Sequence, residues 1–383
     1  MGLALELVLK VTEVCNINCS YCYFFNGPDK SFQAHPKLMS LRTAGGVADY
    51  IRRAAGETQL DAVRLVLHGG EPLMLGKRRF TELCERLHIG DCAARTGLSV
   101  QTNAMLVDDE WIEIFARFGI DVGVSVDGPA DYHDAFRVDH RGRGTHARTA
   151  AGVRRLREAR DAGRLKSLGA ICVVDPTRDA RRVYRHIVDE LGFRTVAFNF
   201  PDADWGNTAP ETVARMGDFL GAALEEWLSD DDPSIAVRPF TGMLAFARAP
   251  GLAAWRALGE TLVLGVASDG SLAPDDSYRM TMPDVFRPDA AALTVWNSEL
   301  GDFRTRYGDG PLPGLSASKP GVCTACAWSA HCRSGEGAHR YDPAGHAWRE
   351  TVYCEALKRV YARLRAYVVE NGGAEPAAMA ACA

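Results

Sequence analysis

The sequence has no long hydrophobic run, no excess of basic residues and no internal repeat, and each absence excludes a class of protein. No stretch of about 18 apolar residues is present, so no membrane-spanning helix is expected. Charged residues interrupt the apolar stretch within the first thirteen positions, which argues against a secretory signal peptide. A formal net charge of −5 gives no reason to expect binding to nucleic acid.

Cysteine, in contrast, is abundant for a chain without a secretory signal. The 383 residues include 11 cysteines. In a reducing compartment such a number argues for metal or redox use and against a disulfide framework, and an odd count fits that interpretation. We therefore expect a cytoplasmic globular protein, long enough for two domains or for one barrel with an appendage.

Short apolar, β-branched runs alternate with amphipathic stretches over the first 230 residues. Strands are predicted at 5–11, 62–68, 97–102, 121–126, 167–174 and 195–200. Helices are predicted at 43–55, 77–89, 110–118, 146–163, 178–191 and 210–228. Strands that alternate with helices predict an α/β fold with a parallel sheet, and six such units predict a (β/α)6 partial barrel.

After residue 233 the alternation stops. Residues 261–267 and 271–273 flank a Ser-Asp-Gly turn and predict a hairpin. A region rich in Pro, Gly and Ser, a second group of cysteines and a helix at 350–370 follow. We therefore predict a barrel domain at 1–232, an auxiliary domain at 233–371 and a frayed tail at 372–383.

Three cysteines, Cys15, Cys19 and Cys22, come directly after the first predicted strand. Closely spaced thiolates on one loop suit an iron–sulfur cluster. A [4Fe–4S] cluster needs four ligands, so three cysteines would leave one iron open. A structural zinc site would close with a fourth Cys or His, and none follows before His35. A loop of reduced cysteines that bind nothing is the alternative, but it leaves the dense spacing unexplained.

Polar and glycine-rich segments also follow other predicted strands. They are Gly69-Gly70-Glu71-Pro72, Gln101-Thr102-Asn103, Ser125-Val126-Asp127-Gly128 and Asn199. In parallel α/β architectures the ligand lies at the carboxyl ends of the strands. We therefore expect these segments to converge with the cysteine loop on one rim.

The pattern C-x3-C-x2-C, with Tyr21 before its last cysteine, resembles the signature of radical S-adenosylmethionine (SAM) enzymes. The resemblance implies that the open iron binds SAM and that an electron from the cluster cleaves SAM to a 5′-deoxyadenosyl radical. Gly69, Gly70, Glu71 and Pro72 resemble the GGEP motif of this family, which implies that Glu71 pairs with the methionine ammonium. A plain turn after a strand is the alternative.

The remaining predicted SAM contacts also rest on this resemblance. Ser125 and Asp127 resemble the family's S-x-D-G segment, and Arg137 resembles the Arg that follows it. A guanidinium fork suits the methionine carboxylate, although Arg137 is alternatively a surface residue of a charged run. Gln101 and Asn103 resemble a Q-T-N-G segment in which Ala104 replaces the usual Gly. Tyr21 and Asn199 complete the predicted set.

The second group of cysteines consists of Cys323, Cys326, Cys332 and Cys354. A zinc ribbon would show paired C-x2-C units, and Cys332 belongs to none. The spacing resembles the SPASM extension of radical SAM enzymes, whose members carry up to two auxiliary [4Fe–4S] clusters. The four cysteines match one of these. The cysteines of the other cluster would fall within residues 264–275 and at position 336, but the first region has no cysteine and position 336 is Glu336. We therefore expect two clusters in total, one at the active site and one auxiliary cluster that serves as an electron relay or sink.

Four cysteines fit neither pattern. We expect Cys84, Cys92 and Cys172 to be small buried hydrophobic residues and Cys382, in the tail, to be incidental.

Asp275 and Asp276 follow the predicted hairpin. The pair resembles a Cys-Asp pair in the sulfatase-maturing branch of the family, where the Asp serves as a base. The resemblance makes Asp276 a candidate general base that takes the proton released when the product forms. A solvated turn with adjacent carboxylates is the alternative.

The last segments resemble one branch of SPASM enzymes. They are Gly335, His339-Arg340-Tyr341, Val352-Tyr353-Cys354 and, less closely, Phe200 to Trp205. That branch crosslinks aromatic rings to side-chain carbons in ribosomally made peptides. The resemblance implies an enzyme that abstracts a hydrogen from a precursor peptide and forms a C–C bond of the cyclophane type. Formylglycine generation in a sulfatase is the closest alternative. Thioether formation, epimerisation and a non-catalytic zinc-binding interaction protein are further ones.

The expected partners follow from this chemistry. They are a ribosomally made precursor peptide and an external one-electron reductant such as flavodoxin or ferredoxin. The leader of the peptide is expected to pair with the edge of the hairpin at 261–267 or to be held by a separate leader-binding protein.

Overall fold

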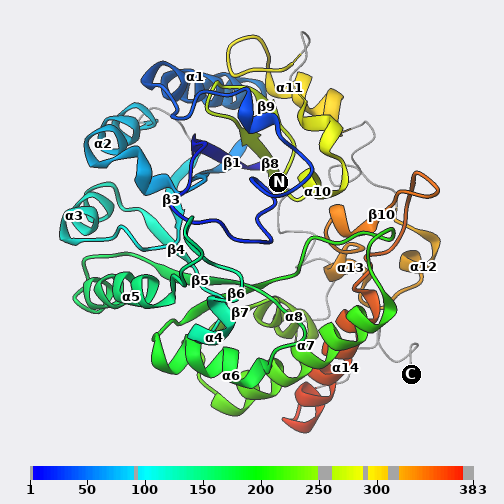
Figure 1. Cartoon of the computed structure of the whole chain (residues 1–383). Coiled ribbons are helices and arrows are strands. Elements are labelled where there is room, and N and C mark those ends of the chain that lie inside the picture. Colours follow the sequence, from blue (N-terminus) through cyan, green and yellow to red (C-terminus); the bar gives the residue numbers. More distant parts are fainter. Residues whose placement is uncertain (1–2, 90–93, 249–260, 288–291, 309–318, 374–383) are drawn as a thin grey trace. The chain divides into compact units, whose positions relative to one another are not determined.

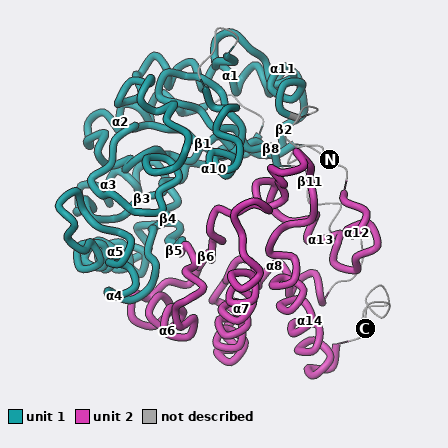
Figure 2. Tube along the Cα trace, turned by 45° about the vertical axis from the view of Figure 1, so that its right-hand side comes forward, with its two compact units in different colours: residues 1–171, 259–311 teal, residues 172–258, 312–383 magenta. Residues whose placement is uncertain are grey.

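The computed structural model describes residues 3–89, 94–248, 261–287, 292–308 and 319–373 (Figure 1). The chain divides into two compact units, coloured separately in Figure 2. Unit 1 comprises Met1–Ile171 and Gly259–Pro311, and unit 2 comprises Cys172–Leu258 and Leu312–Ala383. Among the described helices, none combines the length and the apolar character that crossing a membrane requires.

Unit 1 is built on a sheet with the strand order β5-β4-β3-β2-β1-β8-β9. Its strands are β1 (Leu3–Thr12), β2 (Leu60–Gly69), β3 (Arg95–Thr102), β4 (Asp121–Ser125), β5 (Leu168–Val173, whose last two residues belong to unit 2), β8 (Thr261–Val266) and β9 (Leu272–Ala273). Neighbouring strands are parallel except β8 and β9, which pair antiparallel. The carboxyl ends of β1 to β4 therefore lie at the same edge of the sheet.

Helices follow these strands and lie on the outer side of the sheet (Figure 1). The α-helices of unit 1 are α1 (Leu41–Glu57), α2 (Lys77–Arg86), α3 (Asp109–Phe118), α4 (Ala130–His133), α5 (His146–Asp161), α10 (Tyr278–Thr281) and α11 (Leu300–Phe303). Short turns are η1 (Ser31–Gln33), η2 (Pro72–Leu75), η4 (Pro283–Phe286) and η5 (Arg304–Gly308). Helix α1 starts where the Ser40 hydroxyl accepts a hydrogen bond from the Thr43 amide, and Asp108 caps α3 in the same way.

The core of unit 1 sits between the sheet and its helices. Leu5, Leu7 and Leu9 of β1 are all at most 1% exposed. Burial of each such leucine side chain stabilises the fold by about 1.5–3 kcal/mol. Lys10 is equally buried in the same strand, at 0% exposure, and it is the one charged residue of β1 that the helices and loops cover completely.

Unit 2 contains two short parallel strands, β6 (Thr195–Asn199) and β7 (Ala236–Arg238). Its helices are α6 (Ala180–Arg185), continued by η3 (His186–Glu190), α7 (Pro210–Asp230), α8 (Phe240–Arg248), α12 (Gly321–Thr324), α13 (Ser329–Cys332), η6 (Ala338–Arg340) and α14 (Cys354–Glu370). A small antiparallel pair, β10 (Tyr341–Asp342) and β11 (Ala347–Trp348), completes it. Helix α14 packs against α7 and α8, and Arg363 of α14 forms an ion pair with Glu225 of α7.

The predicted α/β fold is confirmed. All six predicted strands and the six helices predicted between them are present, with ends that differ by a few residues. The helix predicted at 350–370 is α14, and β8 and β9 form the predicted hairpin. Strand β7 and helix α8 were not predicted. The domain boundary at 232 and 233 stays a prediction, and so does the tail at 372–383, most of which lies outside the described residues. Cys92 and Cys382 also lie outside them.

Candidate active site

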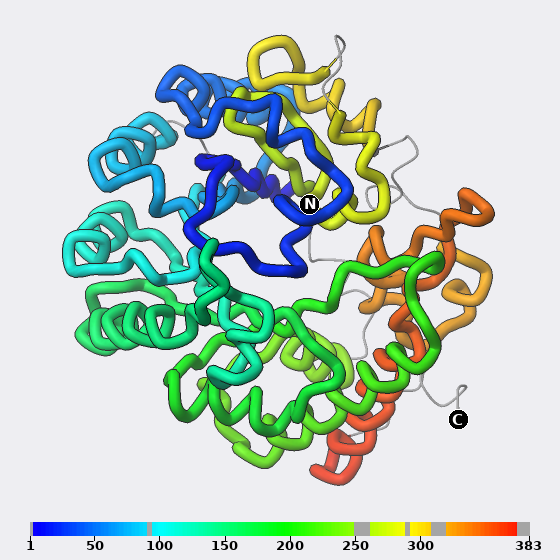
Figure 3. Tube along the Cα trace, in the orientation of Figure 1, coloured from blue at the N-terminus to red at the C-terminus, as the bar shows by residue number. Residues whose placement is uncertain are grey.

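The cysteine loop leaves the end of β1 and runs beside the carboxyl ends of the strands, where it is the dark blue segment of Figure 3. Backbone hydrogen bonds fix it: the Asn18 amide donates to the Val138 carbonyl over 2.7 Å, and the Ser20 amide donates to the Phe136 carbonyl over 3.1 Å. Cys19 is buried, and Cys15 and Cys22 are half-buried, so all three thiols sit in a partly enclosed loop without forming disulfides.

The thiols of this loop influence one another. Burial raises the pKa of Cys15 to about 12 and that of Cys19 to about 11, and neighbouring thiolates contribute to both increases. Among the described residues, no three His, Cys, Asp or Glu side chains are placed so that they could hold a metal ion together. The donor set nevertheless fits an iron–sulfur cluster, because three grouped thiols in a low-dielectric loop gain most from a cation that keeps them deprotonated.

Glu71 lies directly beside this loop. The Gly70 amide donates to the Thr12 carbonyl and the Glu71 amide donates to the Val14 carbonyl, both over 2.9 Å, which joins the end of β2 to the start of the cysteine loop. A Cβ atom on Gly70 would come within 2.0 Å of the Val14 oxygen. Only glycine permits this close approach, so the first half of the predicted GGEP motif has a definite structural role.

The Glu71 carboxylate is almost fully buried and accepts three hydrogen bonds. The donors are the Asn103 amide at 2.8 Å, the Thr102 hydroxyl at 2.6 Å and the Leu73 amide at 3.2 Å. Burial raises the pKa of Glu71 to about 7, although the three donors oppose this increase. Near neutral pH the group is therefore poised between a neutral acid and a carboxylate that can pair with an ammonium ligand.

The ends of β3 and β4 carry the next predicted residues. The Asn103 side chain donates to Asn16 of the cysteine loop over 2.7 Å, and the Gln101 side chain donates to the Ser125 hydroxyl over 2.8 Å. Ala104 adopts a left-handed conformation with φ of 59°. The family motif has Gly here, and the chain keeps that backbone geometry although a non-glycine residue pays about 1–2 kcal/mol for it.

Arg137 forms a buried two-point ion pair with Asp127. Its Nε and Nη2 atoms lie 2.7 and 3.3 Å from the two carboxylate oxygens, and its Nη1 lies 3.8 Å from the Cys19 sulfur. The Tyr21 hydroxyl donates to the same carboxylate. Arg137 is therefore not a surface residue. Its predicted contact with the methionine carboxylate stays a prediction, because two nitrogen atoms of its guanidinium group already pair with Asp127.

Asp276 also lies in unit 1, inside a network of charges. Its Oδ2 accepts from Lys10 Nζ and from the Tyr23 hydroxyl at 3.1 Å, and its Oδ1 accepts from Arg279 Nε at 2.7 Å. Burial alone would raise the pKa of Asp276, but the charges of Lys10 and Arg279 hold that pKa below its usual range. At 12% exposure its side chain does not belong to a solvated turn. The pair of Asp276 with Arg279 continues to Asp29, which Arg279 also contacts.

Sequence reasoning missed the other residues of this network, which are Lys10, Tyr23, Asp29, Arg279 and His68, whose Nδ1 lies 3.3 Å from Lys10 Nζ. Lys10 is a charged residue inside an apolar strand, which was an available signal. The pairing of β1 with β2, which places Lys10 beside His68, could not be read from the sequence.

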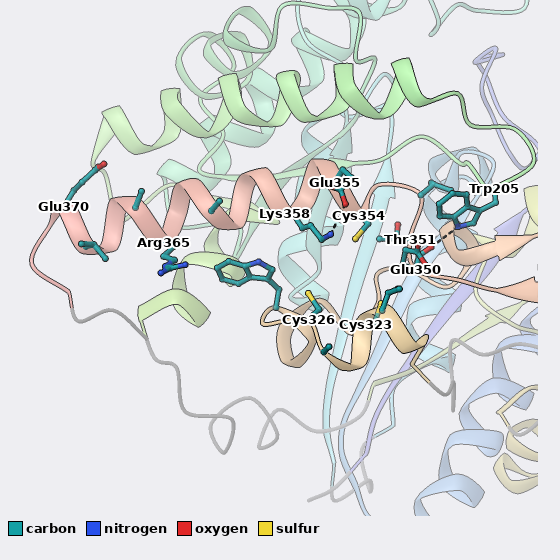
Figure 4. Close-up of a pocket in the computed structure, with 17 residues that line it drawn as sticks. Trp205, Cys323, Cys326, Glu350, Thr351, Cys354, Glu355, Lys358, Arg365 and Glu370 are labelled. Carbon is teal, nitrogen blue, oxygen red and sulfur yellow. Dashed lines mark hydrogen bonds and ion pairs between the residues drawn. The ribbon is translucent and has the colours of Figure 1, made fainter. Parts of the chain in front are cut away.

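The second group of cysteines lies in unit 2. Cys323, Cys326 and Cys354 line a cavity of about 930 Å³, with Trp205 and Lys358 at its wall (Figure 4). Burial raises the pKa of Cys332 to about 11, and the thiolates of Cys354, Cys323 and Cys326 add to the increase. Four mutually influencing thiols with a cavity beside them fit one auxiliary cluster.

Other predicted residues have local roles. Asn199 lies in unit 2, where its side-chain oxygen accepts from Arg238 over 2.7 Å, so its contact with SAM stays a prediction. Cys84 and Cys172 are buried as predicted, at 0% and 1% exposure.

Residues 9–174 match the family model described as Radical SAM superfamily. An uncharacterized protein of Synechocystis is 30% identical over 246 residues, which are 61% of this chain and 58% of that protein. The cysteine-type anaerobic sulfatase-maturating enzyme of Clostridium novyi is 22% identical over 374 residues, which are 93% of each chain. The chain thus spans less than two thirds of the first relative and nearly all of the second.

Solved structures are similar as well. A structure described as native anSMEcpe with bound AdoMet has a TM-score of 0.74 at 20% identity and covers 97% of this chain and 100% of its own. A second structure, with AdoMet and the Cp18Cys peptide, has the same TM-score and identity and covers 96% and 99%. These likenesses show the fold. Among the predicted branches, the comparisons support the relation to sulfatase-maturating enzymes and give no support to the cyclophane-forming branch.

Proposed function

We propose that this chain, a radical SAM enzyme, oxidises a Cys or Ser residue of a sulfatase-type peptide to formylglycine. The observation that carries the proposal is the similarity to a sulfatase-maturating enzyme over 93% of both chains, which is much more of the chain than the matched radical SAM segment at residues 9–174. This reverses the order of the two functions that the sequence predicted. A structure of similar fold, solved with bound AdoMet and a peptide, supports the same class of substrate.

Different residues of unit 1 would bind the cluster, bind SAM and accept the proton. Cys15, Cys19 and Cys22 would hold the cluster, and Glu71 would pair with the ammonium of SAM. When bound, SAM and its cluster supply the radical that removes one hydrogen atom from the peptide. Completing the oxidation requires loss of one proton and one electron. Asp276 would take the proton, because it is ionised at neutral pH, although the charges of Lys10 and Arg279 that lower its pKa also weaken it as a base.

The partners are also part of the proposal. An external one-electron reductant such as flavodoxin or ferredoxin would supply electrons to the first cluster. Cys323, Cys326, Cys332 and Cys354 would hold one auxiliary cluster. A separate leader-binding protein is needed only if the substrate is a ribosomally made precursor with a leader.

Crosslinking of an aromatic ring in a precursor peptide is the second candidate. One observation favours it: the segments that resemble the crosslinking branch pack together within unit 2. The ring of Phe200 lies 5.0 Å from that of Tyr353 and 6.4 Å from that of His339, centre to centre. Residues 264–275 also contain no cysteine for a second auxiliary cluster.

Mass spectrometry separates the two candidates. The reconstituted enzyme is incubated without oxygen with SAM, a strong reductant and matched peptides that carry Cys, Ser or an aromatic residue beside an alkyl side chain. We expect the Cys peptide to exchange its thiol for an aldehyde and the Ser peptide to lose two hydrogens at Ser. Loss of two hydrogens from the aromatic peptide, with fragments that link two residues, would instead favour crosslinking.

Asp276→Asn tests the assignment of the base. The variant should still produce 5′-deoxyadenosine but form at least ten times less product, because a positioned base contributes about 10²–10⁴ in rate. Asp284→Asn is the matched control, because Asp284 is an exposed carboxylate of the same segment. Full product formation by the Asp276 variant would remove Asp276 from the mechanism.

A further inference from the structure

Lys10 joins Asp276 to a histidine that the proposed function does not use. Lys10 of β1 and His68 of β2 are paired in the sheet, so their side chains lie next to each other on the same face. Lys10 Nζ lies 3.3 Å from His68 Nδ1, 3.4 Å from the Tyr23 hydroxyl and in contact with Asp276 Oδ2. An ammonium group only donates, so Nδ1 of His68 accepts and the imidazole carries its proton on Nε2.

We propose that Lys10 and His68 form a proton relay behind Asp276, in which Lys10 passes a proton to His68 when Asp276 takes one from the substrate. The substrate step rests on the proposed function. In that step the S–H bond of the substrate Cys, or the O–H bond of the substrate Ser, breaks. The electron pair stays on the substrate, and an O–H bond forms on Asp276. One Nζ–H bond of Lys10 then breaks and an Nδ1–H bond of His68 forms. Asp276 and Lys10 end neutral, and His68 carries the positive charge.

The charges around Lys10 explain why it would release a proton after Asp276 has taken one from the substrate. Lys10 is fully buried, and burial together with Arg279 lowers its pKa, while Asp276 and, more weakly, Glu13 oppose that decrease. Protonation of Asp276 removes the main group that keeps Lys10 charged. A buried lysine that loses its counterion gives up its proton more easily, because burial disfavours its charged form.

His68 is placed to receive the proton. In the resting state burial and the charge of Lys10 lower the pKa of His68 to about 3, whereas Asp276 and the Gly69 carbonyl favour its charged form. Once Asp276 and Lys10 are both neutral, the decrease due to Lys10 and the opposing effect of Asp276 disappear together, while burial and Arg279 still lower the pKa of His68. His68 is only half-buried, so the charged imidazole retains some contact with solvent.

Arg279 cannot replace Lys10 in this role. It is the other cation on Asp276, and it also contacts Asp29 and the Ser31 hydroxyl. A guanidinium does not release its proton in proteins. Of the two cations that hold Asp276, Lys10 alone can pass a proton on.

Lys10→Arg is the critical variant. Arginine keeps the positive charge and the ion pair with Asp276 but cannot release a proton. If Lys10 only positions Asp276, Lys10→Arg should retain product formation. The relay predicts that Lys10→Arg and His68→Gln each lower product per 5′-deoxyadenosine at least tenfold, and that the double variant is no worse than either. Retained activity in Lys10→Arg, or additive losses, would overturn the relay.

Matched controls and a second measurement keep this test decisive. Lys37→Arg and His88→Gln change exposed residues of unit 1 and should leave the ratio of product to 5′-deoxyadenosine unchanged. Product formation from the unmodified chain tests the proposed function first. If that fails, the relay is still measured without any substrate.

That measurement is the charge state of His68 in the metal-free full chain, followed by NMR with ¹³C-labelled histidine and assigned with His68→Gln. Asp276→Asn imitates the protonated Asp276. We expect His68 to stay neutral down to pH 5 in the unmodified chain and to titrate at least one pH unit higher in Asp276→Asn. A His68 that stays neutral in both proteins would contradict the relay, whatever the enzyme does to peptides.

Discussion

Arg137 and Asp127 neutralise each other in a buried pair beside Cys19. Asp127→Asn would leave the guanidinium buried without its counterion, and such losses cost about 3–5 kcal/mol. We expect urea unfolding of the metal-free chain to show a decrease of that order in the free energy of unfolding.

The pair of Arg52 with Asp49 is the control for this effect, because both side chains are about half exposed or more. Asp49→Asn should cost less than about 1 kcal/mol. Equal losses from Asp127→Asn and Asp49→Asn would mean that the buried pair is no more important than an exposed one.

Glu71 makes the free energy of unfolding depend on pH. Its pKa in the folded chain is about 7, above the ordinary 4.5, so the folded state binds this proton more tightly than the unfolded state does. The resulting stability is fully present below pH 4.5 and is lost as the pH rises to about 7. The whole change is about 3 kcal/mol.

Glu71→Gln removes this titration. We expect the free energy of unfolding of the unmodified chain, minus that of the variant, to fall as urea unfolding is repeated from pH 5 to pH 8. A difference that stays constant over this range would show that Glu71 ionises in the folded chain as it does in water.

Single residues were predictable where a motif surrounds them. Glu71, Asn103 and Asp127 were named from the strand ends on which they lie, and the structure brings them together with the cysteine loop. Lys10 and His68 were not predicted, because their pairing depends on the register of β1 against β2. That register is set by the packing of both strands and not by either segment alone.

At the scale of elements, the approach of β2 to the cysteine loop depends on Gly70. Gly70→Ala would place a methyl group against the Val14 carbonyl and force the two segments apart. We expect this variant to bind less than half of the iron of the unmodified N-terminal site, measured by iron analysis and absorbance after reconstitution.

Gly97→Ala is the matched control, since a Cβ atom at Gly97 of β3 meets nothing within 4 Å. It should retain full iron content. If both variants bind iron equally well, the close approach at Gly70 is not needed to form the site.

Elements with a clear period were predictable and short ones were not. Helix α5 and strand β2 have long patterns, whereas β7 has only three residues and α12 and α13 have four each. Such short elements gain their stability from tertiary packing, which a local pattern does not contain. Helix α8, of nine residues, follows β7 directly and lies after residue 233, where the sequence was predicted to stop alternating between strands and helices.

At the scale of the whole molecule, the two groups of cysteines belong to different units. Removing the second group should therefore leave the first intact. We expect Cys323→Ala combined with Cys354→Ala to reduce bound iron from about eight to about four atoms per chain. Cleavage of SAM should continue.

Cys84→Ala is the control, because Cys84 is fully buried in unit 1 and belongs to neither group. It should keep the full iron content. An unchanged iron content in the double variant would refute the auxiliary cluster.

The reaction was less predictable than the fold. Short C-terminal segments such as His339-Arg340-Tyr341 suggested crosslinking, but they also have a structural explanation: Phe200, His339 and Tyr353 form an aromatic contact inside unit 2. Residues that serve packing can match the same short pattern as residues that serve chemistry, and a short segment does not distinguish them.

The charges Lys10, Asp276, Arg279 and Asp29 alternate in sign along one buried chain of contacts. Any single replacement that removes a charge leaves another charge without compensation in the interior, whereas replacing two neighbours with apolar residues of similar volume need not. An evolutionary path that abandons this network must therefore pass through a less stable intermediate or change two positions almost together. Directed evolution that alters one codon at a time should accordingly leave these four positions unchanged, even when selection favours a new substrate.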